Sequence, residues 1–345
     1  PVSTISAAST TASAPGGTWA RCWAIRAGAS RDPRHARRAL SAGKCATLAA
    51  RFRPLFPTLR CPMRLSAVLL AAALAVPALP AEAGPTLDKV RAAGSIVLGY
   101  RDDAPPFSFR DRDGQVRGYS VELCERAALE VGKAAGVPPL KIEWKPLSAA
   151  ERIDAVAGGT VDLECGTTTI SLSRMARVDF SLPIYVDGGA VLVGTRSKLA
   201  KLADLKGKRI AVIPGTTTEQ ALARTLSAVD APAIVVPIAS IADGIAQLAG
   251  GKVDGVAGDR IVLTVQRQRH PSARDTDFLP TDISYEPYGL VMRRDDPDFR
   301  LAVNRAIVEL YRSGGIDPIF QRWFGALGRP GPLLHAMFYL ATVPQ

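Results

Sequence analysis

Residues 150–169 have the sequence AERIDAVAGGTVDLECGTTT, and residues 240–259 have the sequence SIADGIAQLAGGKVDGVAGD. Each stretch predicts the same three features in the same order: a short helix, a Gly–Gly pair that ends it, and a short strand. A unit that occurs twice in one chain indicates two α/β halves built on one plan. We therefore work outward from these two units.

The first half begins with an apolar run at 95–100, SIVLGY, which predicts the first strand. Residues 119–136, YSVELCERAALEVGKAAG, have apolar side chains at helical spacing, with Ser120 placed to cap the helix and Gly136 to end it. KIEWKPL at 141–147 predicts the next strand. A strand, a helix and a strand in this order form a right-handed crossover between parallel strands.

The second half repeats this order at 203–226, ADLKGKRIAVIPGTTTEQALARTL, which predicts a turn, a buried strand, a Gly–Thr loop and a helix. Two apolar runs, GAVLVGTR at 189–196 and YGLVMRR at 288–294, lie where the chain would leave the first half and return to it. We expect them to be hinge strands. The expected fold is α/β, with two lobes and a ligand cleft between them.

These hinge strands would divide the chain into a discontinuous lobe 1, residues 86–191 plus 288–325, and an inserted lobe 2, residues 192–287. The tail, 326–345, is rich in Gly, Pro and apolar residues, and it either wraps along lobe 1 or is loosely ordered. Ligands of open α/β sheets bind at the carboxyl ends of the strands. We therefore expect the loops after VDLEC, IAVIPG and VDGVAG to line the cleft.

The formal net charge of +11 comes almost entirely from the front of the chain. Residues 1–62 hold nine Arg and Lys44 against the single acid Asp32, so this charge indicates no nucleic-acid partner for the folded part. Residues 63–83 have the pattern of a secretory signal peptide: Met63, a basic residue, a long apolar run and a small-residue cleavage site. We interpret 1–62 as a non-native or disordered upstream extension.

Five cysteines occur in the chain, and three of them, Cys22, Cys45 and Cys61, precede the predicted signal peptide. Export would deliver only Cys124 and Cys165 to an oxidising compartment. We predict a disulfide between them, which would stabilise the fold by about 3 to 4 kcal/mol for a loop of roughly 40 residues. The alternative is two buried thiols.

Seven segments, in the same order over most of the chain after residue 85, resemble the polar amino-acid family of periplasmic solute-binding proteins (family 3). Within it, the pattern is most similar to glutamate/aspartate-binding proteins, which combine an ECGSTT segment with an Arg just after the first strand. The resemblance implies a two-lobed periplasmic-binding-protein fold, an amino-acid ligand and delivery to a membrane ABC permease. The segments are TLDKVRAAGSIVLGYRDDAPPFSF with GYSVELCERAA, ERIDAVAGGTVDLECGTTT, RVDFSLPIY, LADLKGKRIAVIPGTTTEQAL, VDGVAGDR, YGLVMRRDDPDF and IFQRWF.

An amino-acid ligand needs a cation or amide donors for its carboxylate and an anion for its ammonium group. The resemblance implies that Arg174 binds the α-carboxylate, for which the planar guanidinium is suited, and that Asp259 binds the ammonium. Thr167, Thr168 and Thr169 follow the strand VDLEC, and alternation on an extended loop would turn the first and third hydroxyls to the same side. The alternatives are a surface arginine for Arg174, a turn or cap residue for Asp259 and a plain turn for the threonines.

The loop PGTTTEQ places Gly215, Thr216 and Thr217 at a helix N-terminus, where free N–H groups and the helix dipole attract an anion. A generic turn with an N-cap would look the same. Selectivity for an acidic side chain needs further positive charge, and the resemblance implies Arg101 and Arg152 for this role. The alternative for both is a surface arginine paired with a neighbouring acid among Asp102, Asp103 and Glu151.

Two positions depart from the family pattern. Ala149 stands where the relatives have a Ser, although Ser148 is adjacent, and Ile241 stands where they have a His. Each lost polar partner would weaken or redirect recognition by about 1 to 3 kcal/mol. The sequence therefore leaves glutamate, aspartate and larger acidic or amide ligands open.

The main rival from another class is an exported cyclohexadienyl dehydratase acting on prephenate or arogenate, for which Glu164 or Glu286 could serve as general acid or base. A sensing module of a membrane receptor is a third possibility. We expect no cofactor and no metal site, because the only histidines, His35, His270 and His335, lack paired ligand spacing. We expect a periplasmic monomer that is not an enzyme.

Overall fold

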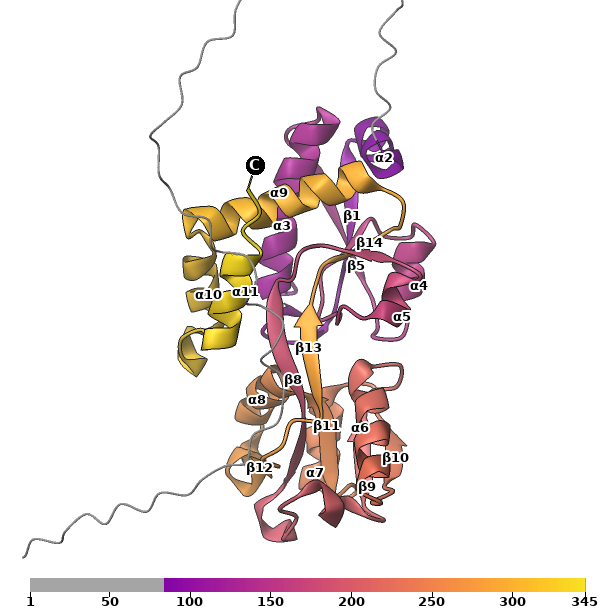
Figure 1. The fold of residues 1–345 in the computed structure, drawn as a ribbon, viewed down its shortest axis with the longest axis vertical. Coiled ribbons are helices and arrows are strands. Elements are labelled where there is room, and N and C mark those ends of the chain that lie inside the picture. The colour runs from indigo at the N-terminus through magenta and orange to yellow at the C-terminus, as the bar shows by residue number, and fades with distance from the viewer. Residues whose placement is uncertain (1–83, 345) are drawn as a thin grey trace, which may run out of the picture. The chain divides into compact units, whose positions relative to one another are not determined.

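The computed structural model describes residues 84–344, which form two lobes joined by strands (Figure 1). Lobe 1 contains a five-stranded sheet and lobe 2 a six-stranded sheet. The predicted extension at 1–62 and the predicted signal peptide at 63–83 lie outside the described residues. Among the described residues, no helix is long and apolar enough to cross a membrane.

The sheet of lobe 1 has the strand order β5-β1-β6-β14-β7, and β1 runs parallel to both β5 and β6. The strand predicted at 95–100 is confirmed as β1, and the strand predicted from 141 is confirmed as β5. The strand predicted as VDLEC is shorter than expected, with only two residues in β6. The strands are β1 (Ser95–Tyr100), β5 (Lys141–Pro146), β6 (Leu163–Glu164), β7 (Asp179–Phe180) and β14 (Val291–Met292).

Helices surround this sheet, and the long α3 packs against α9 beside β1 (Figure 1). A small three-stranded sheet of β2, β3 and β4 follows β1 directly. The bounds are α2 (Pro85–Ala93), α3 (Tyr119–Ala135), α4 (Arg152–Ala157), α5 (Leu172–Met175), α9 (Pro297–Ser313), α10 (Ile316–Phe324), β2 (Asp103–Ala104), β3 (Ser108–Arg110) and β4 (Val116–Arg117).

The start of α3 differs from the prediction. Ser120 is not the cap but the second residue of the helix, fully buried, and its hydroxyl has no hydrogen-bond partner within residues 84–344. The cap position belongs to Gly118, whose φ of 139° and close approach to the Phe107 carbonyl leave no room for a Cβ atom. The prediction for the other end is confirmed, because Gly136 ends the helix in the left-handed conformation.

The sheet of lobe 2 has the order β10-β9-β11-β8-β12, with β13 paired to β8. The recurring helix, Gly–Gly stop and strand are present here as α7, Gly250–Gly251 and β11. The bounds are β8 (Tyr185–Gly194), β9 (Arg209–Val212), β10 (Ile234–Pro237), β11 (Gly255–Asp259), β12 (Thr276–Phe278), β13 (Ser284–Tyr288), α6 (Thr217–Ala228), α7 (Ile241–Ala249), α8 (Arg260–Arg269), η1 (Thr195–Ser197), η2 (Leu202–Leu205) and η3 (Pro271–Asp275).

The strands that cross between the lobes are β8 and β13, an antiparallel pair with Tyr185 opposite Tyr288. The first crossing strand therefore begins at Tyr185, earlier than the predicted 189–196. The second prediction, one strand at 288–294, was wrong: β13 ends at Tyr288, and β14 then joins the sheet of lobe 1. Gly289 separates the two strands, and a Cβ atom there would lie 3.1 Å from Ile170. The lobe limits given above stay a prediction.

An aromatic cluster fills the junction where the crossing strands enter lobe 1. Phe107 lies at its centre, with ring centroids 4.9 Å from Tyr185, 5.2 Å from Tyr288 and 5.3 Å from Phe324. All four rings are buried, so the base of both crossing strands is held by apolar contact and edge-on ring packing. This rigid base leaves the loops at the carboxyl ends of the strands to form the surface between the lobes.

The C-terminal tail is helical rather than a loose end. After η4 (Gly325–Leu327), residues Pro332–Leu340 form α11. Leu334, Phe338 and Ala341 are buried in the main apolar core, and the Phe338 ring lies 5.0 Å from that of Tyr311 in α9. One apolar face of α11 is therefore buried against the core, while Tyr339 and Leu340 remain exposed.

The predicted disulfide between Cys124 of α3 and Cys165 after β6 is confirmed, with Cα atoms 6.1 Å apart. Both residues are fully buried. The bridge ties α3 to the strand end that precedes the three consecutive threonines, and so fixes one wall of the space between the lobes.

Replacing both Cys124 and Cys165 by Ala should lower the free energy of unfolding by about 4 kcal/mol, because the bridge spans 41 residues and restricts the unfolded chain. Urea unfolding of the oxidised wild type and the double variant measures this difference. A reducing agent should bring the wild type close to the variant and leave the variant unchanged. Equal unfolding midpoints for the oxidised wild type and the variant would contradict the prediction.

Candidate functional site

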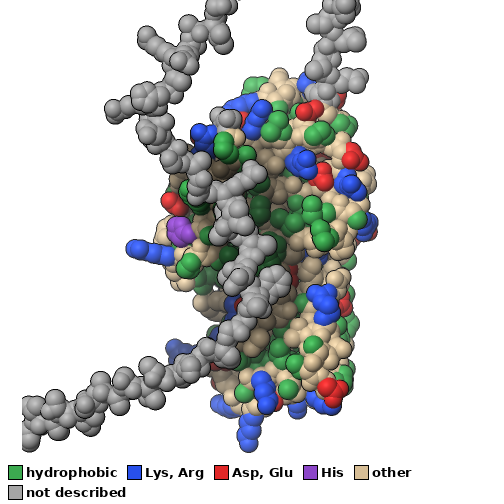
Figure 2. All heavy atoms as spheres, in the orientation of Figure 1, with side chains coloured by type: hydrophobic (Ala, Val, Ile, Leu, Met, Phe, Trp, Pro, Cys, Tyr) green, Lys and Arg blue, Asp and Glu red, His purple; other side chains and the backbone are tan. Residues whose placement is uncertain are grey.

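A cavity lies between the lobes and is lined from both sides. Its volume is about 480 Å³, including the part open to solvent. On the face drawn in Figure 2, basic and acidic side chains are scattered over both lobes. The cavity lining holds two arginines and two aspartates. The lining residues are Arg101, Asp103, Ala104, Arg152, Thr167 and Thr169 from lobe 1, and Ile213, Thr216, Thr217, Thr218, Ile241, Ala257, Gly258, Asp259 and Val262 from lobe 2.

The three consecutive threonines after β6 point alternately, as the extended loop predicts. Thr167 and Thr169 line the cavity, while the Thr168 hydroxyl donates a hydrogen bond to Glu164 at 2.8 Å, away from it. The loop is held by the returning strand, because Thr169 forms a β-bridge with Tyr288. Of the three, Thr168 is the one that does not line the cavity.

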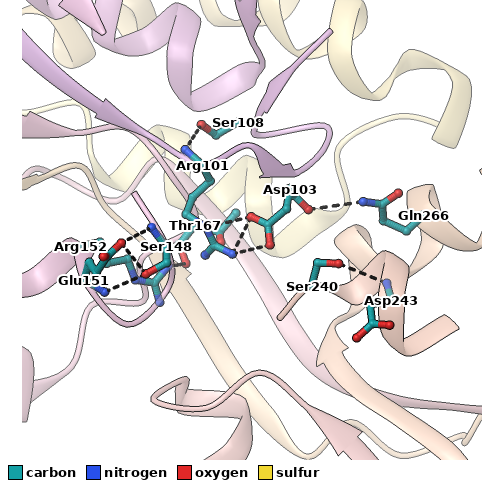
Figure 3. A network of polar contacts seen from close by, with 10 residues as sticks. All are labelled: Arg101, Asp103, Ser108, Ser148, Glu151, Arg152, Thr167, Ser240, Asp243 and Gln266. Carbon is teal, nitrogen blue, oxygen red and sulfur yellow. Dashed lines mark hydrogen bonds and ion pairs between the residues drawn. The ribbon is translucent and has the colours of Figure 1, made fainter. Parts of the chain in front are cut away.

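Arg101 follows β1 and its side chain is only 5% exposed. Its guanidinium donates two hydrogen bonds to Asp103, each 2.9 Å long, and its backbone N–H donates to the Ser108 hydroxyl (Figure 3). Arg101 thus lines the cavity and is paired with a neighbouring acid, but it is not a surface arginine, and its contact with a ligand stays a prediction. Its charge is balanced within the protein before any ligand arrives.

Arg152 opens α4 and is 3% exposed. Its Nη1 donates to the Thr167 carbonyl at 3.2 Å, and its Nε has no partner among the described residues. Glu151, the expected alternative partner, bonds to Ser148 instead (Figure 3). Burial lowers the pKa of Arg152 to about 10, with Arg174 acting in the same direction and Glu164 against it. The guanidinium thus stays charged at neutral pH and has donors to spare.

Arg174 lies in α5 and does not line the cavity. Its Nη1 donates to the Thr169 carbonyl at 2.9 Å, so it supports the threonine loop from behind. Burial lowers its pKa, while Glu286, Glu164 and Asp259 raise it. The direct carboxylate contact that the resemblance implies for Arg174 stays a prediction.

Glu164 is a fully buried acid close enough to Arg152 to influence its pKa. Burial raises the pKa of Glu164, and Arg152 lowers it more than any other neighbour. One carboxylate oxygen accepts from Thr168, and the other has no hydrogen-bond partner among the described residues. The sequence suggested Glu164 only as a general acid or base for the rival enzyme. The signal for its role beside Arg152 was an acidic residue near the end of the predicted strand VDLEC.

The lobe 2 wall is built at the N-terminus of α6. Thr216 is the N-cap and accepts from the Glu219 N–H at 3.1 Å, while the Gly215 N–H donates to the Glu219 carboxylate at 2.8 Å. Gly215 is therefore engaged within the helix start and does not line the cavity. Thr216 and Thr217 do line it, and so does Thr218, which sequence reasoning missed.

Asp259 ends β11 and faces the cavity. The Thr218 hydroxyl donates to its carboxylate at 3.0 Å. Burial raises the pKa of Asp259, and the nearby Glu286 carboxylate adds to this. A cationic group in the cavity would relieve both effects, which agrees with the ammonium-binding role implied by the resemblance.

The two departures from the family pattern lie in and beside the cavity. Ile241 lines it with Val262 and Ile213, so this part of the wall is apolar. Ala149 and Ser148 border a neighbouring pocket that shares Arg101 and Asp103 with the cavity. The Ser148 hydroxyl bonds to Glu151 at 2.7 Å. Within residues 84–344, no group of three or more His, Cys, Asp or Glu side chains could hold a metal ion.

Comparison with known proteins identifies the family. Residues 96–326 match the bacterial extracellular solute-binding proteins, family 3, and the chain belongs to this family. An L-glutamate/L-aspartate-binding protein from Pseudomonas aeruginosa is 31% identical over 264 residues, which cover 76% of this chain and 87% of the relative.

Two solved structures are similar at the level of the fold. An ancestral arginine-binding protein bound to glutamine has a TM-score of 0.59 and 30% identity, covering 67% of this chain and 98% of that one. An ancestral amino acid-binding protein, AncCDT-1, described as a precursor of cyclohexadienyl dehydratase, has a TM-score of 0.60 and 27% identity, covering 69% of this chain and 99% of that one. The two-lobed α/β prediction is thereby confirmed.

Asp187 of β8 gives the stability of the fold a predictable pH dependence. Burial raises the pKa of its carboxyl from an ordinary value of 3.8 to about 8, with Asp259 acting in the same direction. Hydrogen bonds from the N–H groups of Gly188 and Ile261 and from the Tyr288 hydroxyl act against this. Between these two pKa values the unfolded chain has lost the proton while the folded protein keeps it, so the free energy of unfolding falls as pH rises.

Asp187→Asn cannot titrate, and it should flatten the fall in unfolding free energy between about pH 5 and about pH 8. Urea unfolding at several pH values, with wild type and variant in the same buffers, measures this. The other buried carboxylates remain in both proteins, so the difference between the two curves isolates Asp187. Identical slopes would contradict the assignment.

Proposed function

We propose that this protein captures an acidic amino acid, glutamate or aspartate, in the cavity between its lobes and presents it to a membrane ABC permease. The observation that carries the proposal is the buried guanidinium of Arg152, which lines the cavity and forms no ion pair with a described carboxylate. A buried charge that lacks a partner is costly, and an anionic ligand group would supply the partner.

The cavity has an acidic residue, Asp259, as well as the basic Arg152, and this supports a zwitterionic ligand rather than a simple anion. Asp259 faces the same cavity from lobe 2 with a pKa raised by burial, so it favours a cation beside it. An α-amino acid carries both signs on one carbon atom. Binding it would engage lobe 1 and lobe 2 together, which is the physical basis for closure of the lobes on the ligand.

The relatives support a ligand with an acidic side chain. The residues that line the cavity in this chain modify how that side chain would be bound. The relative from P. aeruginosa is named for L-glutamate and L-aspartate. In this chain Arg101 is already paired with Asp103, and Ile241 adds an apolar wall where the family pattern has a His. We propose that Arg152 takes the larger share of the ligand's side-chain carboxylate, with Arg101 as a secondary contact.

We also propose a cellular location, the periplasm, and a partner, the permease. The family is described as extracellular, and the predicted signal peptide at 63–83 would direct the protein to the periplasm. There it would act as a monomer, with lobe 1 at 86–191 plus 288–325 and lobe 2 at 192–287. The closed form would be the one that the permease recognises.

A second candidate, an exported cyclohexadienyl dehydratase, is raised by the likeness to AncCDT-1. Such an enzyme needs a general acid or base in contact with substrate. Glu164 and Glu286, the carboxylates considered for this role, do not line the cavity and are occupied by threonine hydroxyls. This arrangement favours binding without turnover.

Calorimetric titration of the purified, ligand-stripped protein against glutamate, aspartate, glutamine, asparagine and prephenate tests the proposal. We expect an acidic amino acid to bind most tightly. Arg152→Ala should weaken it by about a hundredfold or more, since a buried charged hydrogen bond is lost. Arg101→Ala should have a smaller effect, because its charge is already balanced by Asp103.

Arg312→Ala is the matched control, because this arginine lies exposed in the last turn of α9. It removes the same side chain and should leave binding unchanged. Tight binding of an amide with no effect of Arg152→Ala would overturn the acidic ligand. Consumption of prephenate would move the protein to the enzyme class.

A further inference from the structure

Glu286 is a fully buried carboxylate that does not line the cavity but touches residues that do. It projects from β13, the strand that returns to lobe 1. One of its oxygens accepts hydrogen bonds from the hydroxyls of Thr169 in lobe 1 and Thr217 in lobe 2, the latter at 2.6 Å. The other accepts from Ser284. Three hydroxyls of different segments thus converge on one side chain.

The hydrogen bonds to Glu286 fix the direction in which the two threonine hydroxyls point. A hydroxyl has one proton to donate, and a carboxylate can only accept. The Thr169 and Thr217 oxygens are also 3.1 Å apart. Two patterns are possible: both hydroxyls donate to Glu286, or one donates to the other threonine, which in turn donates to Glu286. In both patterns each hydroxyl proton is engaged in a hydrogen bond within the protein. Toward the cavity, these two hydroxyls have only lone pairs.

We propose that Glu286 is a positioning residue that makes the Thr169–Thr217 wall an acceptor surface, so that the site selects ligands with an ammonium group at this wall. This inference rests on the proposed function. It adds that the hydroxyls of Thr169 and Thr217 do not bind the ligand carboxylate as donors. Asp259 faces the same cavity and adds a further acceptor, while Arg152 supplies the donors. Glu286 thereby separates the acceptor side of the cavity from its donor side.

A glutamine at position 286 would weaken or reverse this polarity. If its NH2 group takes the place of the oxygen that Thr169 and Thr217 contact, at least one threonine hydroxyl would accept from the amide and turn its own proton to the cavity. If the NH2 group turns to Ser284 instead, the threonines keep an acceptor but the negative charge behind them is lost, so an ammonium group is held less well in both cases. A ligand without an ammonium group would lose little. Simple loosening of the structure would weaken both kinds of ligand equally.

The test is calorimetric titration of the purified protein with L-glutamate and with glutarate, which has the same two carboxylates and no ammonium group. Wild type should prefer glutamate. Glu286→Gln should lower that preference by about tenfold or more, because hydrogen bonds involving a charged partner are affected. Glu286→Asp keeps the acceptor and should retain most of the preference even if both affinities fall. Glu309→Gln, on the exposed face of α9, is the matched control and should change neither affinity.

Each other outcome has a defined meaning. An equal loss for both ligands in Glu286→Gln would overturn the inference, and so would a wild type that binds glutarate as tightly as glutamate, although an acidic ligand would then stand. A wild type that binds neither of these ligands nor L-aspartate would overturn the proposed function and this inference with it. If Glu286→Gln does not fold, Thr217→Val removes one acceptor and should weaken glutamate more than glutarate, with equal weakening as the contradicting result.

Discussion

The buried guanidinium of Arg152 is the constraint on which the arrangement of the site depends. A charge that is 3% exposed must be compensated, and the protein does this only in part. Glu164 raises the pKa of the guanidinium, the Thr167 carbonyl accepts from Nη1, and Nε has no partner among the described residues. The compensation that is missing has the chemistry of a ligand carboxylate. A site prepared in this way gives up some stability of the free protein for affinity.

The rest of the fold holds the incompletely compensated charge of Arg152 in place. The disulfide and the aromatic cluster fix the threonine loop and the base of the crossing strands, so the loop that carries Thr167 and Thr169 has little freedom. The return strand brings Glu286 to the same loop and to α6 of lobe 2. Because Glu286 lies on β13, the contacts that orient the threonine hydroxyls depend on the same pair of strands, β8 and β13, that joins the lobes.

The sequence predicts the local elements well and the long-range polar contacts poorly. β1, β5 and the recurring helix, Gly–Gly stop and strand follow from apolar patterning, and the disulfide follows from the pairing of two exported cysteines. The cap of α3 was misplaced because Gly118 owes its role to a close approach to Phe107, which no local pattern reveals. The roles of Glu164 and Glu286 depend on partners brought together by the fold, in the second case 117 residues apart in sequence. Patterning could place the threonines on one side of a loop, but not the direction of their hydroxyl protons.

A crystal structure of the protein with bound L-glutamate tests the central claim most directly. The account predicts that the ligand lies between the lobes, with a carboxylate accepting hydrogen bonds from Arg152, including its Nε, and the ammonium group directed to Asp259 and the threonine hydroxyls. A ligand whose carboxylates avoid Arg152, with Nε still without a partner, would contradict it.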